Sequence, residues 1–232
     1  GHLEQSTQTG LWRISTLAAS KGGGRLAVGG RRKQGGGRVE LRSLGGDPNA
    51  KRSVNIDWGF VTDLFFSPDD RHLVAFLSPV RDKSGSERQI RIFDATSLEQ
   101  VGLRVLREHP ITGCFLTSTR FVAGSPEGTV FVFDTVLSKF ETTPFKDPKT
   151  TFGGAMAGSI RGMLTSPDRS WLYTAFGSRK KNAGGIAVWN AQSHELLRRV
   201  DDLPAIRGLS ISPSGEHLSV TTYDPPTLQL WR

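Results

Sequence analysis

The sequence contains one cysteine, two methionines and no long apolar run. The single thiol, Cys114, excludes a disulfide within the chain and a cysteine-rich zinc site. Cys114 lies in the apolar run 111–116, which favours a small core residue over a nucleophile. No stretch of 18 or more apolar residues occurs, so we expect no transmembrane helix. Since the lack of disulfides fits a reducing compartment, we expect an intracellular protein, cytoplasmic or nuclear.

Patterns of common enzyme sites are also missing. The glycine clusters at 22–24, 29–30 and 35–37 do not lead into Gly-Lys-Ser/Thr, so they predict no P-loop. The histidines lack the spacing of metal ligands, and no nucleophile elbow occurs, so we expect no metal and no cofactor. The acidic pairs Asp69-Asp70 and Asp201-Asp202 fall in predicted turns, where paired acids are poorly placed for catalysis. An enzyme is therefore the least favoured interpretation.

What the sequence does contain is a repeated strand pattern. With 36% hydrophobic residues, 27 glycines and 12 prolines, the 232-residue chain can bury a core and make many turns. Five segments consist of an apolar residue, a spacer and a second apolar residue, which is strand periodicity. They are Val39–Leu41, Ile90–Ile92, Val130–Val132, Ile186–Val188 and Leu228–Leu230.

A turn motif precedes several of these segments. Ser67-Pro68-Asp69, Ser166-Pro167-Asp168 and Ser212-Pro213-Ser214 each lead into a further apolar strand. Proline presets its own φ, and Asp or Ser can bond to the nearby backbone, so the motif predicts a tight turn between two strands. The repeated unit is then strand a, a tight turn, strand b, a variable loop, strand c and a weaker strand d.

Four strands in a repeat of roughly 40 to 45 residues are typical of a propeller blade. An isolated four-stranded meander cannot bury both faces, so the repeats are expected to stack around an axis. The predicted fold is all-β, a β-propeller of four-stranded antiparallel blades over residues 11–232. Five blades are legible, at residues 11–50, 51–105, 106–150, 151–203 and 204–232.

The ends of the predicted c strands carry a family resemblance. After the Ser-Pro-Asp turn, strand c ends in an aromatic residue followed by a polar one: Phe93-Asp94, Phe133-Asp134, Trp189-Asn190 and Trp231-Arg232. This pattern resembles the WD40 repeat over nearly the whole chain, although the family's Gly-His dipeptide and most of its turn aspartates are absent. The resemblance implies a scaffold or adaptor for protein–protein interaction. The absence of these groups predicts that the blades lack the family's side-chain network and rely on apolar packing.

Ring closure has two candidate solutions. The last repeat stops at strand c, and residues 2–7 could supply its outer strand, so that the two termini pair and close a five-bladed ring. Residues 1–10 would then combine a cloning remnant, Gly1-His2, with this closing strand. The alternative is an incomplete ring that a partner completes with a blade, as in some coat and nuclear-pore propellers. The oligomeric state is left open.

Basic residues concentrate in three of the five loops between strands b and c. The net charge of +8 and the pI near 10.1 favour acidic partners. Propeller geometry would gather these loops on one face, together with two arginines at the start of strand a. The predicted basic face comprises Arg31, Arg32, Lys33, Arg38, Arg81, Lys83, Arg88, Arg161, Arg179, Lys180, Lys181 and Arg207. Trp12 and Trp58 are candidate aromatic contacts beside it, or else pack between blades.

The leading hypothesis is a non-enzymatic scaffold whose basic face binds a protein partner, with acidic segments favoured. The alternative is that the same face binds nucleic acid, RNA above all, or phosphoinositide headgroups of an anionic lipid surface. Binding through several phosphates would weaken steeply as salt rises. A solvated basic surface with no partner is the simplest reading of such loops.

Overall fold

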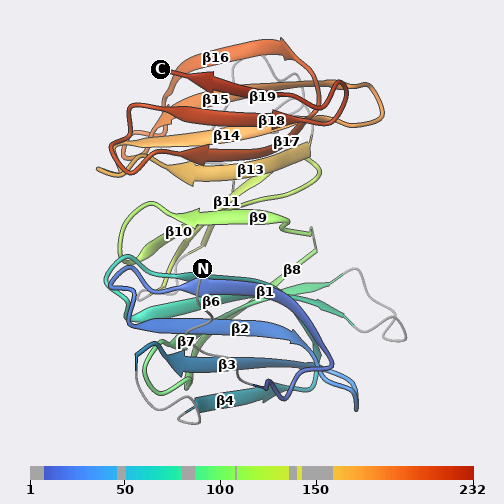
Figure 1. The fold of residues 1–232 in the computed structure, drawn as a ribbon, viewed down its shortest axis with the longest axis vertical. Coiled ribbons are helices and arrows are strands. Elements are labelled where there is room, and N and C mark those ends of the chain that lie inside the picture. Colours follow the sequence, from blue (N-terminus) through green and yellow to red (C-terminus); the bar gives the residue numbers. More distant parts are fainter. Residues whose placement is uncertain (1–7, 46–50, 80–86, 108, 136–139, 143–158) are drawn as a thin grey trace. The chain divides into compact units, whose positions relative to one another are not determined.

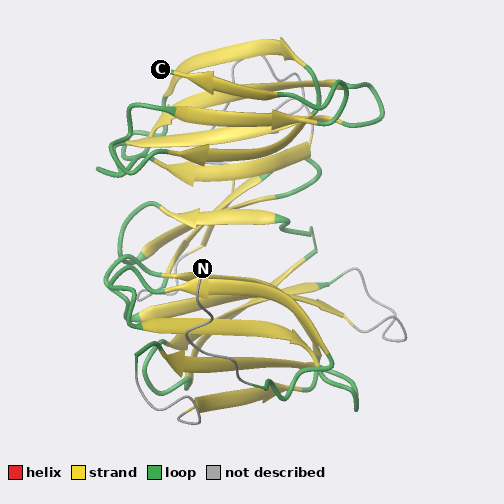
Figure 2. Ribbon diagram, in the orientation of Figure 1, coloured by secondary structure: helices red, strands yellow, loops and turns green. Residues whose placement is uncertain are grey.

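The computed structural model consists of antiparallel sheets joined by turns and loops (Figures 1 and 2). It describes residues 8–45, 51–79, 87–107, 109–135, 140–142 and 159–232. Over these ranges, strands β1 to β19 form five sheets, and there is no helix of the length and apolarity needed to cross a membrane. The chain divides into two compact units, Gly1–Arg107 and Glu108–Arg232. The all-β architecture predicted from the alternating pattern is confirmed.

The first unit contains two four-stranded sheets in which consecutive strands pair antiparallel. One sheet has the order β1 (Arg13–Ala19), β2 (Arg25–Arg31), β3 (Gly37–Ser43) and β4 (Lys51–Ile56). The other has the order β5 (Gly59–Phe66), β6 (His72–Pro79), β7 (Arg88–Asp94) and β8 (Gln100–Leu106). Strand β5 contacts β1, β2 and β3, so the first strand of the second sheet packs on the face of the first sheet. Between the sheets lies a core that includes Val39, Leu64 and Phe93.

The second unit contains three sheets of the same meander type. The first of them contains β9 (Thr112–Phe115), β10 (Arg120–Gly124), β11 (Val130–Asp134) and β12 (Phe140–Thr142). The second contains β13 (Ser159–Thr165), β14 (Trp171–Ser178), β15 (Ala183–Asn190) and β16 (Leu196–Leu203). The third contains β17 (Ile206–Ile211), β18 (Leu218–Thr222) and β19 (Leu228–Trp231). As in the first unit, the first strand of each later sheet packs on the sheet before it, since β13 contacts β9 and β17 contacts β13.

All five apolar–spacer–apolar segments lie in the third strand of a sheet, namely in β3, β7, β11, β15 and β19. Among the described residues the last sheet contains three strands, which agrees with the expectation that the last repeat ends at strand c. Strand β4 pairs with β3 and so belongs to the first sheet, although it lies beyond residue 50, where the first repeat was expected to end. Residues 2–7, the candidate closing strand, lie outside the described residues.

The serine of the turn motif holds each turn together. The hydroxyl of Ser67 accepts a hydrogen bond from the backbone N–H of His72 (2.8 Å), and Ser166 accepts one from Trp171 (3.0 Å). Ser212 accepts the equivalent bond from His217 (3.1 Å). The motif therefore stabilises the turn as predicted, because the serine hydroxyl accepts a hydrogen bond from a backbone N–H of the turn.

A buried polar contact refines the expectation that apolar packing holds the blades. The indole Nε1 of Trp189 in β15 donates to the hydroxyl of Thr174 in β14 at 2.8 Å. Both residues are fully buried. The expectation is therefore incomplete for this sheet, because a hydrogen bond between side chains joins its two central strands within the apolar core.

Cys114 packs against the buried cluster that includes Ile160 and Trp189. Burial raises the pKa of its thiol to about 12, although the charge of Arg169 acts in the opposite direction. The thiolate is the reactive form of cysteine and is scarcely populated at neutral pH under these conditions. Cys114 is therefore a partly buried residue at the margin of the core, and its thiol is a poor nucleophile, as the sequence predicts.

Candidate binding sites at the loop ends of the sheets

In the first unit, the turn between β2 and β3 places three predicted basic residues together. Arg31 ends β2, and Arg32 and Lys33 follow it in the turn. The guanidinium of Arg31 lies 5.9 Å from the ring centre of Trp12 and 5.9 Å from that of Phe60. Trp12 also donates its backbone N–H to the carbonyl of Arg31 (2.9 Å), and its side chain is exposed. The structure therefore brings Arg31 and Trp12 together as a cation–π pair at this turn.

Arg32 and Lys33 differ in what they can offer a partner. The Nη2 atom of Arg32 lies 2.5 Å from the carboxylate of Asp57, which comes from the loop after β4. Lys33 is exposed at the tip of the same turn. Lys33 is therefore the more accessible cation, while Arg32 contributes to tying two loops of the sheet together.

Arg38 belongs to an internal ion-pair network instead of an open basic surface. Its Nε lies 3.1 Å from a carboxylate oxygen of Glu40, and Nη2 of Arg42 lies 2.9 Å from the other oxygen. Glu40 is fully buried and also accepts the backbone N–H of Gly10 at 2.7 Å. The three charged residues alternate along β3 and so share one face of the strand. Arg38 thus neutralises a buried carboxylate, and its part in partner binding stays a prediction.

The remaining predicted residues of this unit differ in their burial and in what they contact. Trp58 is half-buried and packs against the core cluster of the two sheets, which is the second of its two predicted roles. Arg88 begins β7, is half-buried and donates to the carbonyl of Glu87 at 3.1 Å. Arg81 and Lys83 lie outside the described residues.

In the second unit, the corresponding turn lies between β14 and β15. It carries Arg179, Lys180 and Lys181, and all three are exposed. The guanidinium of Arg179 lies 4.8 Å from the ring centre of Tyr223, which follows β18. Asn182 ties this turn to the neighbouring sheet, because its amide donates to the carbonyl of Asp224 (2.5 Å) and accepts from the N–H of Ala205 (3.2 Å). Sequence reasoning missed Tyr223 and Asn182, which no repeat pattern marks.

Beside this turn lies a hollow of about 850 Å³, here called the basic cavity. Arg161 from β13, Lys181 from the turn and Arg199 from β16 line it, together with Asp201 and Asp202. The guanidinium of Arg199 stacks 4.5 Å from the ring centre of Phe176, and its Nε lies 2.6 Å from Asp201. The structure therefore brings Arg161 and Lys181, two predicted residues, to one cavity. Arg207, in β17, is exposed but does not line it.

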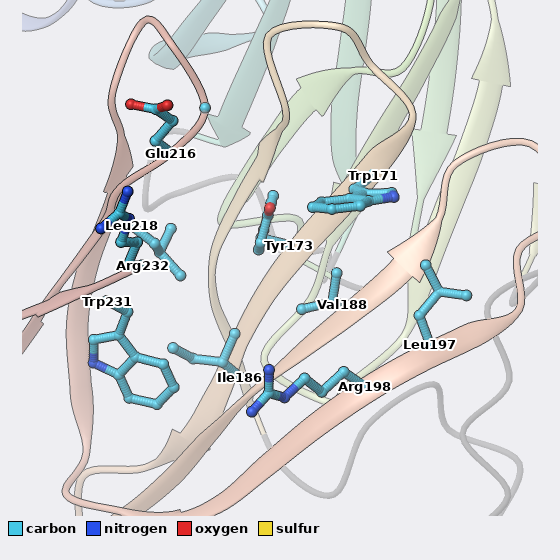
Figure 3. Close-up of a pocket in the computed structure, with 11 residues that line it drawn as sticks. Trp171, Tyr173, Ile186, Val188, Leu197, Arg198, Glu216, Leu218, Trp231 and Arg232 are labelled. Carbon is cyan, nitrogen blue, oxygen red and sulfur yellow. The ribbon is translucent and has the colours of Figure 1, made fainter.

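A second hollow, of about 320 Å³, is apolar and is lined by the last two sheets (Figure 3). Its wall includes Trp171 and Tyr173 of β14, Leu197 of β16 and Trp231 of β19. In the described residues β19 pairs only with β18, which leaves its other edge open. Leu228 and Leu230 on this strand are strongly exposed. Trp231 of this strand lines the hollow, whereas Leu228 and Leu230 do not and alternate with it along β19.

No protein-family model matches the chain, and a search of curated proteins found no match. Functional assignment therefore depends on the residues of the sites. Among the described side chains, no three His, Cys, Asp or Glu are grouped as metal ligands. The two features that stand out are the basic turns beside aromatic rings and the basic cavity.

Proposed function

We propose that this chain is a WD40-like β-propeller that acts as a non-enzymatic scaffold or adaptor inside the cell, in the cytoplasm or the nucleus. Its basic turns would bind an acidic segment of a protein partner within a larger complex. One observation carries the proposal. In both units, a turn between the second and third strand of a sheet bears clustered cations with an arginine beside an aromatic ring, Arg31 with Trp12 and Arg179 with Tyr223.

Such turns suit an acidic protein segment for physical reasons. Arginine and aromatic side chains are enriched among the residues that contribute most to protein interfaces. An arginine held against a ring loses less conformational freedom when a carboxylate binds to it. The net charge of +8 adds a long-range attraction for acidic partners that salt would weaken.

The proposed ring consists of five blades closed by an outer strand from residues 2–7. The three-stranded last sheet and the open edge of β19 support this closure, because an exposed edge of this kind invites pairing. The apolar hollow of Figure 3 gives a fourth strand a surface to cover. A blade supplied by a partner would use the same edge and is the alternative.

The test is affinity capture from a cell lysate with the intact chain and two charge-reversal variants. The first variant, Lys33→Glu with Lys180→Glu, changes one exposed cation in each basic turn. The matched control, Lys21→Glu with Lys51→Glu, makes the same change in charge at exposed sites away from these turns. We expect the first variant to lose at least about 90% of the captured partner and the control to retain most of it.

Two outcomes would contradict the proposal. If both variants lose the partner equally, the turns have no special role. If capture disappears after nuclease treatment and the purified chain binds RNA with a steep dependence on salt, nucleic acid is the ligand instead.

A further inference from the structure

The basic cavity contains a buried hydroxyl group that its own sheet does not use. Ser159 lies at the start of β13, is 9% exposed and lines the cavity. Its Oγ atom is buried and has no hydrogen-bond partner among the residues that the structure describes. Leaving a buried hydroxyl unpaired is unfavourable, and native proteins rarely do so without a ligand, an ion or a water molecule. Because Ser159 lines the cavity, rotation about its Cα–Cβ bond would let the hydroxyl meet a polar group that enters there.

The charged side chains around Ser159 indicate which charge the entering group carries. Arg161, Lys181 and Arg199 contribute three positive charges, and Asp201 and Asp202 contribute two negative charges. One net positive charge remains, and it matches a singly charged ligand group. Asp201 and Phe176 hold the guanidinium of Arg199 in place, so its orientation is set before a ligand binds. Arg161 and Lys181 are exposed and can turn toward the ligand.

The cavity is large enough for a peptide segment, with a side chain and the backbone that carries it. About 850 Å³ is far more than a single small ion occupies and is in the range of sites for larger ligands. Gly177 and Gly184 lie in the wall where β14 and β15 approach each other. A Cβ atom on Gly177 would collide with the carbonyl oxygen of Ala183, so the wall requires a residue without a side chain.

We propose that the basic cavity binds the carboxylate of a glutamate or aspartate from the partner's acidic segment, with Ser159 Oγ as a hydrogen-bond donor and Arg161 and Lys181 as its cationic contacts. This inference rests on the proposed function and names the subsite that would give it specificity. A phosphate monoester carries close to two charges at neutral pH, which exceeds the charge that the cavity can neutralise. A carboxylate carries one.

The test uses fluorescence anisotropy with three labelled nine-residue peptides in which glycine alternates with glutamate, phosphoserine or glutamine. The intact chain is titrated alongside Ser159→Ala, Arg161→Gln and the control Arg198→Gln, which removes a charge from β16 outside the cavity. We expect the glutamate peptide to bind and the glutamine peptide not to bind. Ser159→Ala should weaken binding about tenfold, because a hydrogen bond to a charged group is lost. Arg161→Gln should weaken it about threefold, and Arg198→Gln less than twofold.

The results separate this inference from the proposed function. Tighter binding of the phosphoserine peptide than of the glutamate peptide would overturn the choice of a carboxylate. If neither cavity variant changes binding of the glutamate peptide while Lys33→Glu with Lys180→Glu still abolishes capture, the subsite is wrong and the basic turns remain valid. Arg161 is exposed, so its variant gives a result even if Ser159→Ala proves unstable.

Discussion

At the scale of single residues, the first unit depends on a buried carboxylate. Glu40 is fully buried between Arg38 and Arg42, and Gly10 donates its N–H to the same group. Desolvation makes such a network costly unless every member is paired. The segment that precedes β1 is tied to the sheet through it, since Nη2 of Arg42 also donates to the carbonyl of Gln8 at 2.7 Å.

Replacing Glu40 by glutamine should therefore be strongly destabilising. The variant leaves two arginines without their counter-ion, and we expect the free energy of unfolding to fall by about 3 kcal/mol. Urea unfolding followed by tryptophan fluorescence measures this change. The control is Asp57→Asn, because Asp57 is an exposed partner of Arg32 and should matter by less than about 1 kcal/mol. An equal fall in the free energy of unfolding in the two variants would show that the burial of Glu40 does not increase its contribution to stability.

Single residues also show where sequence reasoning reached its limit. Arg38 looks like one more cation of a basic loop until Glu40 and Arg42 are seen on the same face of β3. The alternation of opposite charges at every second position was a readable signal of an ion-paired face. No such signal marks Ser159, because its importance arises from burial beside charges that come from β13, the β14–β15 turn and β16.

At the scale of elements, the Ser-Pro-Asp turns are stabilised by their aspartates as well as their serines. The hydroxyls of Ser166 and Ser170 donate to Asp168 and hold the pKa of its carboxyl below the ordinary value. A lowered pKa in the folded state stabilises the protein above the unfolded-state pKa, near 3.9, and this stabilisation disappears as the pH falls through the folded pKa.

The variant Asp168→Asn tests the contribution of this turn. At pH 6 we expect the melting temperature of the variant to lie below that of the unaltered chain. The difference should shrink below pH 4, as the carboxyl of the unaltered chain becomes protonated. Asp94→Asn should behave in the same way, since backbone N–H groups of Ser97 and Thr96 lower the pKa of Asp94. A difference that stays constant from pH 6 to pH 2 would contradict the account.

Elements differ in how well the sequence predicts them. Strands β7, β11 and β15 were predictable because both of their faces are largely buried, so apolar residues recur at fixed positions, whereas β19 shows the same alternation although Leu228 and Leu230 are exposed. The fourth strands are harder, because their outward positions mix polar and apolar residues. Strand β4 reads Lys-Arg-Ser-Val-Asn-Ile and was assigned to the wrong side of a boundary, while β8 exposes Val101 and Val105.

At the scale of the whole molecule, the proposal requires that all five sheets are arranged radially. Strand periodicity sets which residues of a sheet face its neighbour, and the two units show this packing between successive sheets within each of them. The angle between successive sheets, and hence the number of blades that closes a ring, depends on the fit of whole faces. Local sequence patterns do not encode that fit, which is why the sequence supported both a closed and an incomplete ring.

The proposed radial arrangement predicts on which face each basic turn lies. Within the first sheet, Lys21 lies in the turn between β1 and β2, and Lys33 lies in the turn between β2 and β3, at opposite ends of the strands. Lys180 lies in the turn between β14 and β15 of the second unit. If the sheets are blades of one propeller, Lys33 and Lys180 share a face, and Lys21 lies on the other face.

Distances between paired spin labels measure this arrangement directly. Labels are attached to cysteines that replace Lys33 and Lys180 in one sample, and Lys21 and Lys180 in another. Cys114 is replaced by alanine in both samples, so that only the introduced cysteines are labelled. The account predicts a shorter mean distance for the 33–180 pair than for the 21–180 pair. The reverse order would place the basic turns on opposite faces and contradict it.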